Sequence, residues 1–291
     1  MPGRDQADVP PPRQSAATDY VLTAAGREEA EHARLEHLQE LFDPQSQRRL
    51  ARVQPGWRCL DVGAGRGSIA LWLSRRVGTS GEVVATDIDI SGLKHLGAAR
   101  CEVLTHNILS DPLAPLRPGS FDLIFARLVL VHLPGQQEPA VRRMIECLRP
   151  GGWLVIEDID MTTLSSTDPR HPLSADFDRI LQAMRDGYRA RQLLDITCGR
   201  ALGAVLRRSG LFNVEQEVSA KIHAGASPMA RWHAQSMRAI VDNLVKRGVP
   251  EDARRAAIAA SALLVKALED PDFSFLDQLH HAAWGQRAVS D

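Results

Sequence analysis

The chain has almost no excess charge of either sign. Its 291 residues carry 35 lysine and arginine residues against 36 aspartate and glutamate residues, so the formal net charge is -1 with neutral histidines. Binding to nucleic acid depends on lysine and arginine neutralising phosphates, and a balanced chain exerts no long-range attraction on a polyanion. We therefore expect no nucleic-acid partner.

Long hydrophobic runs are also missing. The longest nearly apolar stretch, residues 256–265, is bounded by Arg255 and Lys266, and it is about half as long as a membrane-spanning helix must be. Apolar residues nevertheless make up 44% of the chain, which is enough to bury a full core. We expect a folded protein that does not enter a membrane.

Cysteines are few and widely spaced. None of Cys59, Cys101, Cys147 and Cys198 has a close neighbour in the sequence, and most of them fall in stretches that we expect to be core strands or helices. Buried, reduced thiols are typical of proteins in a reducing compartment. This favours a cytoplasmic location. The first 17 residues contain four prolines, acidic residues and no apolar stretch, so they resemble neither a secretory signal nor a transit peptide.

Short apolar runs alternate with amphipathic stretches from residue 57 onward. The expected strands are 57–62, 82–86, 101–105, 121–126 and 153–156, and the expected helices between them are 67–77, 91–99 and 136–148. Strands that are apolar on both faces and alternate with helices indicate a parallel sheet covered by helices on both sides. The handedness of parallel crossovers favours a doubly wound topology. We predict an α/β, Rossmann-like, seven-stranded, mostly parallel sheet with a helical lid and insertion.

A glycine-rich turn follows the first of these strands. In CLDVGAGRGSIALWL, residues 59–73, Asp61 is followed by Gly63, Gly65 and Gly67 and then by a helix. Glycines permit positive φ and a close approach of the backbone to a ligand, and a helix N-terminus favours an anion. About 20 residues after the last glycine, Asp87 ends a strand, where an acid can accept both ribose hydroxyls. An ordinary strand–helix turn or a dinucleotide site remains compatible with the glycines alone.

The even glycine spacing after Asp61 resembles motif I of the class I S-adenosylmethionine-dependent methyltransferases. The resemblance extends to Asp87 after the second strand, Asn107 after the third, the fourth strand FDLIFARLVLVHL and the segment LRPGG at residues 148–152. Together these features cover about residues 57–160. The family usually has aspartate where Asn107 stands, but an amide oxygen accepts the same hydrogen bond.

The resemblance implies S-adenosylmethionine as cofactor and places particular residues around it. Those residues are Tyr20, Asp61, Gly63, Ala64, Gly65, Asp87, Ile88, Asn107, Ile108, Ala126 and Arg127. By this resemblance Asp61 orients the ammonium group of the cofactor, Asp87 binds its ribose, and Asn107 faces the adenine amino group. Tyr20 closes over the cofactor or, equally, is a packing tyrosine.

The division of the chain follows from the resemblance and from the pattern outside the core, where helices are expected at 23–42, 45–53, 175–194, 200–209, 228–247 and 251–268. We expect a disordered leader (1–17), an N-terminal helical lid (18–55), a cofactor-binding Rossmann-like core (56–160), lid helices with the return to the sheet (161–219), a helical insertion that caps the substrate (220–272), and a last strand with a tail (273–291). The apolar stripes of the lid and the insertion leave a homodimer open.

Methyl transfer from a sulfonium is an in-line displacement, so positioning and water exclusion dominate and a base is optional. His132, Glu157 and Asp158 follow the strands at the ligand edge and are the candidate bases; each can also be an ordinary loop residue. His171, His223 and His233 can line a pocket, although we expect them at the surface. Arg127 stands where a metal-dependent relative needs an acid, so no metal is expected.

The sequence therefore predicts transfer of a methyl group to an oxygen, nitrogen or carbon nucleophile of a small, fairly apolar molecule. One alternative is an enzyme of the same fold that keeps the cofactor without methylating, as a cyclase would. Another is a nicotinamide-dependent dehydrogenase. Methylation of a nucleic acid or a protein is a further, weaker alternative.

Overall fold

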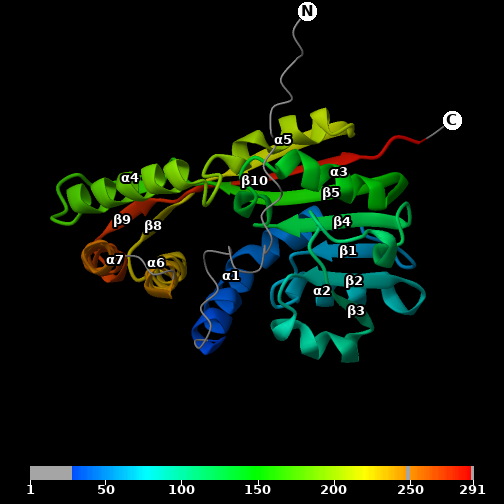
Figure 1. Ribbon diagram of the computed structural model, residues 1–291, viewed down its shortest axis with the longest axis horizontal. Helices are drawn as coiled ribbons and strands as arrows, with labels where there is room; N and C mark the ends of the chain where they lie inside the picture. The colour runs from blue at the N-terminus through cyan, green and yellow to red at the C-terminus, as the bar shows by residue number, and fades with distance from the viewer. Residues whose placement is uncertain (1–27, 247–249, 290–291) are drawn as a thin grey trace, which may run out of the picture.

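A twisted sheet with helices on both faces carries the central part of the chain, as the computed structural model shows for residues 28–246 and 250–289 (Figure 1). The sheet has seven strands in the order β3-β2-β1-β4-β5-β10-β7. The strands are β1 (Arg58–Val62), β2 (Glu82–Asp87), β3 (Cys101–Thr105), β4 (Phe121–Arg127), β5 (Leu148–Asp160), β7 (Phe212–Ser219) and β10 (Leu279–Gln286). Only β10 runs antiparallel to its neighbours in this sheet. The predicted seven-stranded, mostly parallel, doubly wound sheet is confirmed.

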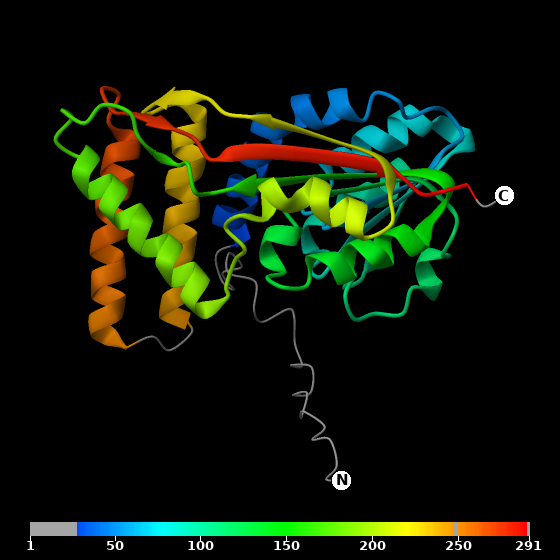
Figure 2. The ribbon, with the colours of Figure 1, turned by 90° about the horizontal axis from the view of Figure 1, so that it is seen from above.

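Helices cover the two faces of this sheet with separate hydrophobic cores. One face packs against α2 (Ser68–Val77), the 3₁₀ helix η3 (Ser91–Ala99) and the end of α1 (Glu28–Arg49). The other face packs against α3 (Gln137–Cys147) and α5 (Cys198–Arg208). Figure 2 shows these two layers on either side of the strands. All five residues of β1 are buried, as expected of a central strand covered on both sides.

Three of the expected helices differ from the sequence-based prediction. The helices expected at 23–42 and 45–53 form one helix, α1, with Pro44 inside it. Proline removes one backbone hydrogen bond, but Asp43 and Ser46 on either side are held to the sheet by side-chain contacts, and these keep the helix continuous. Residues 91–99 form a 3₁₀ helix, which agrees with the low α-helix propensity of Gly92 and Gly97.

A second module, which we call the cap, lies beyond the ends of β5, β10 and β7 (Figure 1). It contains α4 (Ser174–Arg191), α6 (Pro228–Lys246), α7 (Glu251–Glu269) and a three-stranded sheet, β6 (Ser165–Ser166), β9 (Ser274–Leu276) and β8 (Ile222–Ala224). These elements share a hydrophobic core of their own. The small sheet repeats the order of the large one, since β6 follows β5, β9 precedes β10 and β8 follows β7. The cap is therefore an extension of three strands of the main sheet.

This arrangement changes parts of the predicted organisation. Residues 161–219 divide between the modules, because α4 packs in the cap whereas α5 packs on the main sheet. The region 220–272 is not purely helical, since it begins with β8, and the single strand expected at 273–284 is two strands separated at Asp277 and Gln278. The break lies where the sheet passes from the core to the cap.

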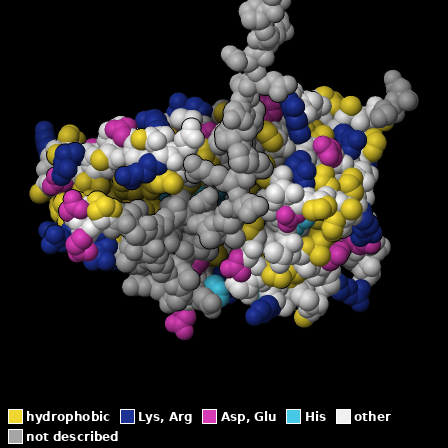
Figure 3. All heavy atoms as spheres, viewed as in Figure 1, with side chains coloured by type: hydrophobic (Ala, Val, Ile, Leu, Met, Phe, Trp, Pro, Cys, Tyr) yellow, Lys and Arg dark blue, Asp and Glu magenta, His cyan; other side chains and the backbone are white. Residues whose placement is uncertain are grey.

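The surface and the core agree with the composition. All four cysteines are buried and unpaired, as expected. Within residues 28–246 and 250–289, no helix has the length and apolar character needed to cross a membrane. On the face shown in Figure 3, acidic and basic side chains are interspersed.

Candidate functional site

The polar residues predicted for the site come together at one edge of the main sheet. Parallel pairing sets Val62 of β1 beside Thr86 of β2 and Ala126 of β4, and it sets Arg127 of β4 beside Glu157 of β5. The carboxyl ends of these strands therefore lie along the same edge. Ligands of open α/β sheets bind at this edge.

The glycine-rich turn has the backbone that its sequence predicts. Gly63, Gly65 and Gly67 have φ values of 68°, 59° and 75°, which residues with a side chain rarely adopt. A Cβ atom on Gly63 would lie 2.5 Å from Cγ2 of Val129, whereas one on Gly65 would meet no atom within 4 Å. The turn thus packs tightly at Gly63 and leaves its backbone accessible at Gly65.

Asp87 ties the end of β2 to this turn. Its carboxylate accepts hydrogen bonds from the backbone N–H groups of Gly65 at 2.8 Å and of Asp89 at 3.1 Å. Burial raises the pKa of Asp87, and these two hydrogen bonds oppose the rise. The carboxylate is therefore fixed against the glycine turn at the edge of the sheet.

Asp61 is a buried carboxyl group beneath the same turn. Its side chain is 3% exposed, and burial raises its pKa to about 7, although the charge of Arg127 opposes the rise. A buried acid of this kind gains from a cationic ligand group, because the opposite charge favours its ionised form. Asp61 is thus suited to contact an ammonium group.

The other predicted cofactor residues lie on neighbouring strand ends. Asn107 follows β3, and its side-chain oxygen accepts the N–H of Leu109 at 2.9 Å. Ile108 and Ala126 are buried, whereas Ile88 and Ala64 are partly exposed.

Tyr20 and the leader 1–17 lie outside the described residues, as do parts of the predicted lid at 18–27 and of the final tail.

Helix α1 lies across this edge and is held there by charged side chains. Arg127 contacts Asp43 at 2.9 Å and the hydroxyl of Ser46 at 3.0 Å. Glu157 accepts the hydroxyl of Ser46 at 2.5 Å and a guanidinium N–H of Arg49 at 2.9 Å. The sequence did not identify these three α1 residues, because Asp43-Pro44 is a typical helix end.

These contacts bear on the candidate bases. Both carboxylate oxygens of Glu157 are engaged by α1. The pKa of His132 is lowered to about 3, first by burial and then by the charge of Arg34, so its imidazole is neutral at neutral pH. Asp158 accepts the N–H groups of Val131 and Ile159 inside the core, and burial raises its pKa to about 7. Catalytic roles for His132 and Glu157 remain predictions.

A cluster of histidines surrounds Asp277 where the two sheets meet. The Nε2 atoms of His233, His280 and His223 lie 2.7, 3.0 and 3.7 Å from the carboxylate of Asp277. Burial would raise the pKa of Asp277, but His233 and His280 reverse the effect and hold it well below the usual range. His171 lies apart, 3.5 Å from Asp270.

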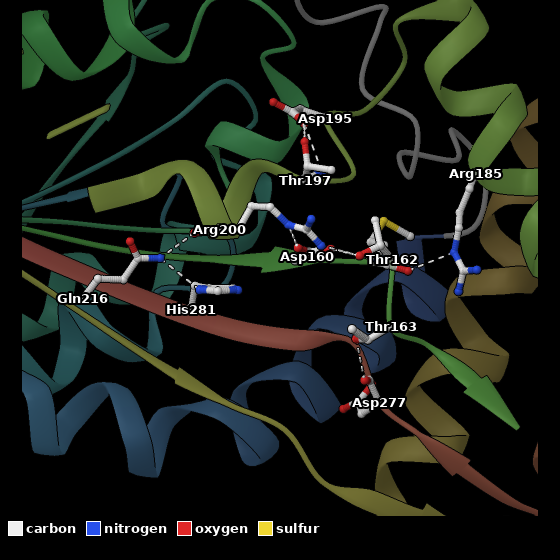
Figure 4. Close-up of polar contacts among 12 residues, drawn as sticks. Asp160, Thr162, Thr163, Arg185, Asp195, Thr197, Arg200, Gln216, Asp277 and His281 are labelled. Atoms are coloured by element: carbon white, nitrogen blue, oxygen red, sulfur yellow. Dashed lines mark hydrogen bonds and ion pairs between the residues drawn. The ribbon is translucent and has the colours of Figure 1, made fainter. Parts of the chain in front are cut away.

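We expected these cap histidines at the surface. That expectation is wrong for His233, which is 4% exposed and contacts the buried carboxylate of Asp277. Asp277 and His280 were not identified from the sequence, which offers no spacing signal for them. Figure 4 shows Asp277 facing Thr163, whose hydroxyl donates to the Asp277 carbonyl at 3.1 Å. Within the described ranges, no group of three or more ligating side chains is arranged to hold a metal ion.

Comparisons with known proteins find similarity to methyltransferases in the central part of the chain. A family described as a methyltransferase domain matches residues 60–156. The methyltransferase str2 of Strobilurus tenacellus is 34% identical over 145 residues, which are 49% of this chain and 50% of that protein. The ubiquinone/menaquinone biosynthesis C-methyltransferase UbiE of Azotobacter vinelandii is 33% identical over 115 residues, 37% of this chain and 44% of that protein. The chain thus spans about half the length of these curated relatives.

A solved structure shares the fold. A Bacillus halodurans protein assigned as a methyltransferase superposes with a TM-score of 0.52 and 13% identity, covering 84% of this chain and 98% of that one.

Proposed function

The chain contains a methyltransferase domain of the class I S-adenosylmethionine-dependent type, and from this premise we propose that it transfers a methyl group from that cofactor to a small, fairly apolar molecule. The observation that carries the proposal is the set of Asp61, the glycine turn and Asp87 on adjacent strand ends. The name of the str2 relative points to methylation in general. The name of the UbiE relative points to quinone biosynthesis, which supports a small acceptor.

The residues at the edge fit this cofactor. Gly65 leaves its backbone accessible, and the buried Asp61 gains from an ammonium group. Asp87 can exchange the N–H of Gly65 for ribose hydroxyls, since a carboxylate accepts hydrogen bonds from either. When bound, the cofactor supplies an electrophilic methyl group on a sulfonium. The polar groups of the edge, the buried carboxylate of Asp61, the partly exposed carboxylate of Asp87 and a glycine backbone, match a ligand with a cationic end and a sugar.

We assign the remaining contacts to residues at the ends of β1, β2, β3 and β4. Ile88, Asn107 and Ile108 flank the adenine ring, and the backbone at Ala64, Ala126 and Arg127 contacts the amino-acid end. Tyr20 completes the enclosure. The two anchors of Arg127 in α1, Asp43 and Ser46, fix the backbone at the end of β4.

The chain's own part in the reaction is to position the acceptor and to exclude water. Helix α1 acts as the lid, because its buried contacts with Arg127 and Glu157 close the edge of the sheet. The cap, which lies beyond the end of β5 and the start of β10, supplies side chains that contact the methyl acceptor. Correct orientation of two reactants accelerates a displacement without a base. When the nucleophile begins protonated, the neutral imidazole of His132 is the candidate proton acceptor, since Glu157 is already paired with Arg49.

Neither the cyclase-like nor the dehydrogenase alternative is favoured, because the matched family is a methyltransferase domain.

A labelled-methyl assay tests the proposal. The wild-type chain is incubated with methyl-labelled S-adenosylmethionine and a panel of phenols, quinols and aromatic amines, and the products are analysed by mass spectrometry. We expect an acceptor that gains one methyl group, together with an equal amount of S-adenosylhomocysteine, and no product from Asp87→Ala. Conversion of an acceptor without a gained methyl group would contradict the proposal.

A further inference from the structure

Three polar atoms of the cap and its junction with the main sheet are buried without a hydrogen-bond partner among the described residues. They are the indole Nε1 of Trp232, the hydroxyl of Ser236 and the amide Nε2 of Gln278. Their side chains are 5%, 7% and 2% exposed, respectively. A buried polar group without a partner destabilises a fold unless something accepts its hydrogen bond. Where several such groups lie in one region of the fold, they can together bind a ligand that accepts their hydrogen bonds.

The geometry of α6 brings two of these groups onto one face. Trp232 and Ser236 are one turn apart, and on a helical wheel Ser236 lies between Trp232 and His233. The indole of Trp232 meets the Phe42 ring edge-on at 5.7 Å, and Nε2 of His233 donates to the Asp277 carboxylate at 2.7 Å. The face that carries Ser236 is therefore turned toward α1 and the junction.

Gln278 belongs to the junction itself. Its backbone N–H donates to the Asp277 carboxylate at 2.8 Å, and Asp277 binds His233 of α6. Figure 4 shows this junction, where Thr163, between β5 and β6, faces Asp277, between β9 and β10. Gln278 thus stands next to the residue that fastens α6 to the main sheet.

The junction also adjoins the edge at which the methyl group is expected. Phe42 of α1 contacts both Trp232 and His280, and the next residue, Asp43, contacts Arg127 at the end of β4. Leu128, with a φ of 56°, follows β4 directly and packs against the cores of both modules. A molecule held at the junction would therefore reach toward the end of β4.

The chemistry of the three groups defines what they can bind. An indole N–H only donates, an amide NH₂ donates, and a hydroxyl can donate. Trp232 belongs to the apolar core of the cap together with Met229 and Met237, and Phe42 packs against that core and contacts Trp232. A ligand that satisfies this set has an apolar ring and one or two oxygen atoms that accept hydrogen bonds.

We propose that Trp232, Ser236 and Gln278 form the subsite that binds the carbonyl or ether oxygen of an aromatic methyl acceptor. The proposal rests on the proposed function, because it names the acceptor of that reaction. It assigns substrate orientation to the junction of the two sheets, and it leaves cofactor binding to the other strand ends.

Nitrogen-15 NMR of the indole groups tests the subsite with defined probes. The probe is chromone, a bicyclic ring with one carbonyl and one ether oxygen, and naphthalene is the hydrocarbon control of the same size. Both are titrated into the full chain saturated with S-adenosylhomocysteine, and Trp232→Phe identifies the resonance of Trp232. We expect chromone to move that resonance downfield and naphthalene to leave its proton shift near the starting value.

Two serine variants complete the test. Ser236→Ala removes one donor of the subsite, and we expect it to weaken chromone binding roughly 3- to 10-fold while naphthalene binding stays the same. Ser209→Ala is the matched control, since the Ser209 hydroxyl is also buried without a partner but lies at the end of α5. It should leave chromone binding unchanged.

The subsite is wrong if chromone does not move the Trp232 resonance, or if Ser236→Ala binds chromone as tightly as Ser209→Ala does. Normal binding of S-adenosylhomocysteine in that experiment would leave the proposed function standing. Failure of the wild-type chain to bind S-adenosylhomocysteine would instead contradict the proposed function itself.

Discussion

The cofactor edge, formed by the ends of β1, β2 and β3, and the junction between the two sheets are built by different kinds of contact. At the cofactor edge, the contacts are made by backbone groups and carboxylates close to strand ends, as when the N–H of Gly65 donates to Asp87. At the junction, side chains from distant parts of the chain meet, as when His233 of α6 meets Asp277. Both regions contain buried acids with shifted pKa values, but in opposite directions.

The direction of the shift reflects whether a partner is built into the fold. Asp277 has hydrogen-bonding partners in His233 and His280, so its pKa falls despite burial. At Asp61 burial prevails over the opposing charge of Arg127 and a backbone hydrogen bond from Ala70, so the pKa rises to about 7. The carboxylate of Asp277 thus has its partners within the fold, whereas Asp61 would gain from a cationic ligand group.

Removal of the Asp277 carboxylate should give the largest change in stability. Asp277→Ala leaves His233 and His280 buried without their shared partner, and we expect the free energy of unfolding to fall by about 3 kcal/mol. Chemical denaturation measures it, with the exposed Asp272→Ala as a near-neutral control. The affinity for S-adenosylhomocysteine should not change. A loss of that affinity in the folded variant would show that the two regions are not independent.

Asp87→Ala should act on the opposite side of the comparison. It removes the proposed acceptor of the ribose hydroxyls, and because hydrogen bonds to a charged group are strong, we expect the affinity for S-adenosylhomocysteine to fall roughly 100-fold. Calorimetry measures the change. Asp89→Ala, two residues away in an exposed position, should bind as the wild type does. Equal losses in both variants would contradict a specific role for Asp87.

Glu157 connects the two regions through α1. Glu157→Ala leaves Arg49 and Ser46 without their buried partner, and we expect the free energy of unfolding to fall by about 2 kcal/mol and amide exchange in α1 to increase. Arg179→Gln breaks an exposed ion pair with Asp176 and should change stability by less than about 0.5 kcal/mol. Wild-type stability in Glu157→Ala would mean that the contact does not anchor the lid.

The pKa of Asp61 predicts the smallest effect, a pH dependence of cofactor binding. Below about pH 7 the free protein holds a proton on Asp61, and contact with the ammonium group requires its release. Affinity for S-adenosylhomocysteine should therefore rise about tenfold from pH 6 to pH 8 and then level off. Asp61→Asn should bind more weakly and lose this dependence between pH 6 and pH 8. An unchanged pH profile in Asp61→Asn would assign the titration to another group.

The sequence predicted the sheet and the cofactor edge because both depend on short-range patterns. Alternating apolar runs specify the strands, and the spacing of Asp61, Gly63 and Gly65 needs only the turn that contains it. The junction depends on contacts such as that between Phe42 and His280, which no local pattern encodes. The two-helix prediction for α1 was wrong for the same reason, since the contacts of Asp43 and Ser46 with the sheet outweigh the effect of Pro44.

Calorimetry of the wild-type chain with S-adenosylhomocysteine and, separately, with NADH tests the central claim most directly. The account predicts saturable binding of one S-adenosylhomocysteine per chain and no heat of binding with NADH. Binding of NADH without binding of S-adenosylhomocysteine would contradict it, because the glycine turn and Asp87 would then serve a dinucleotide.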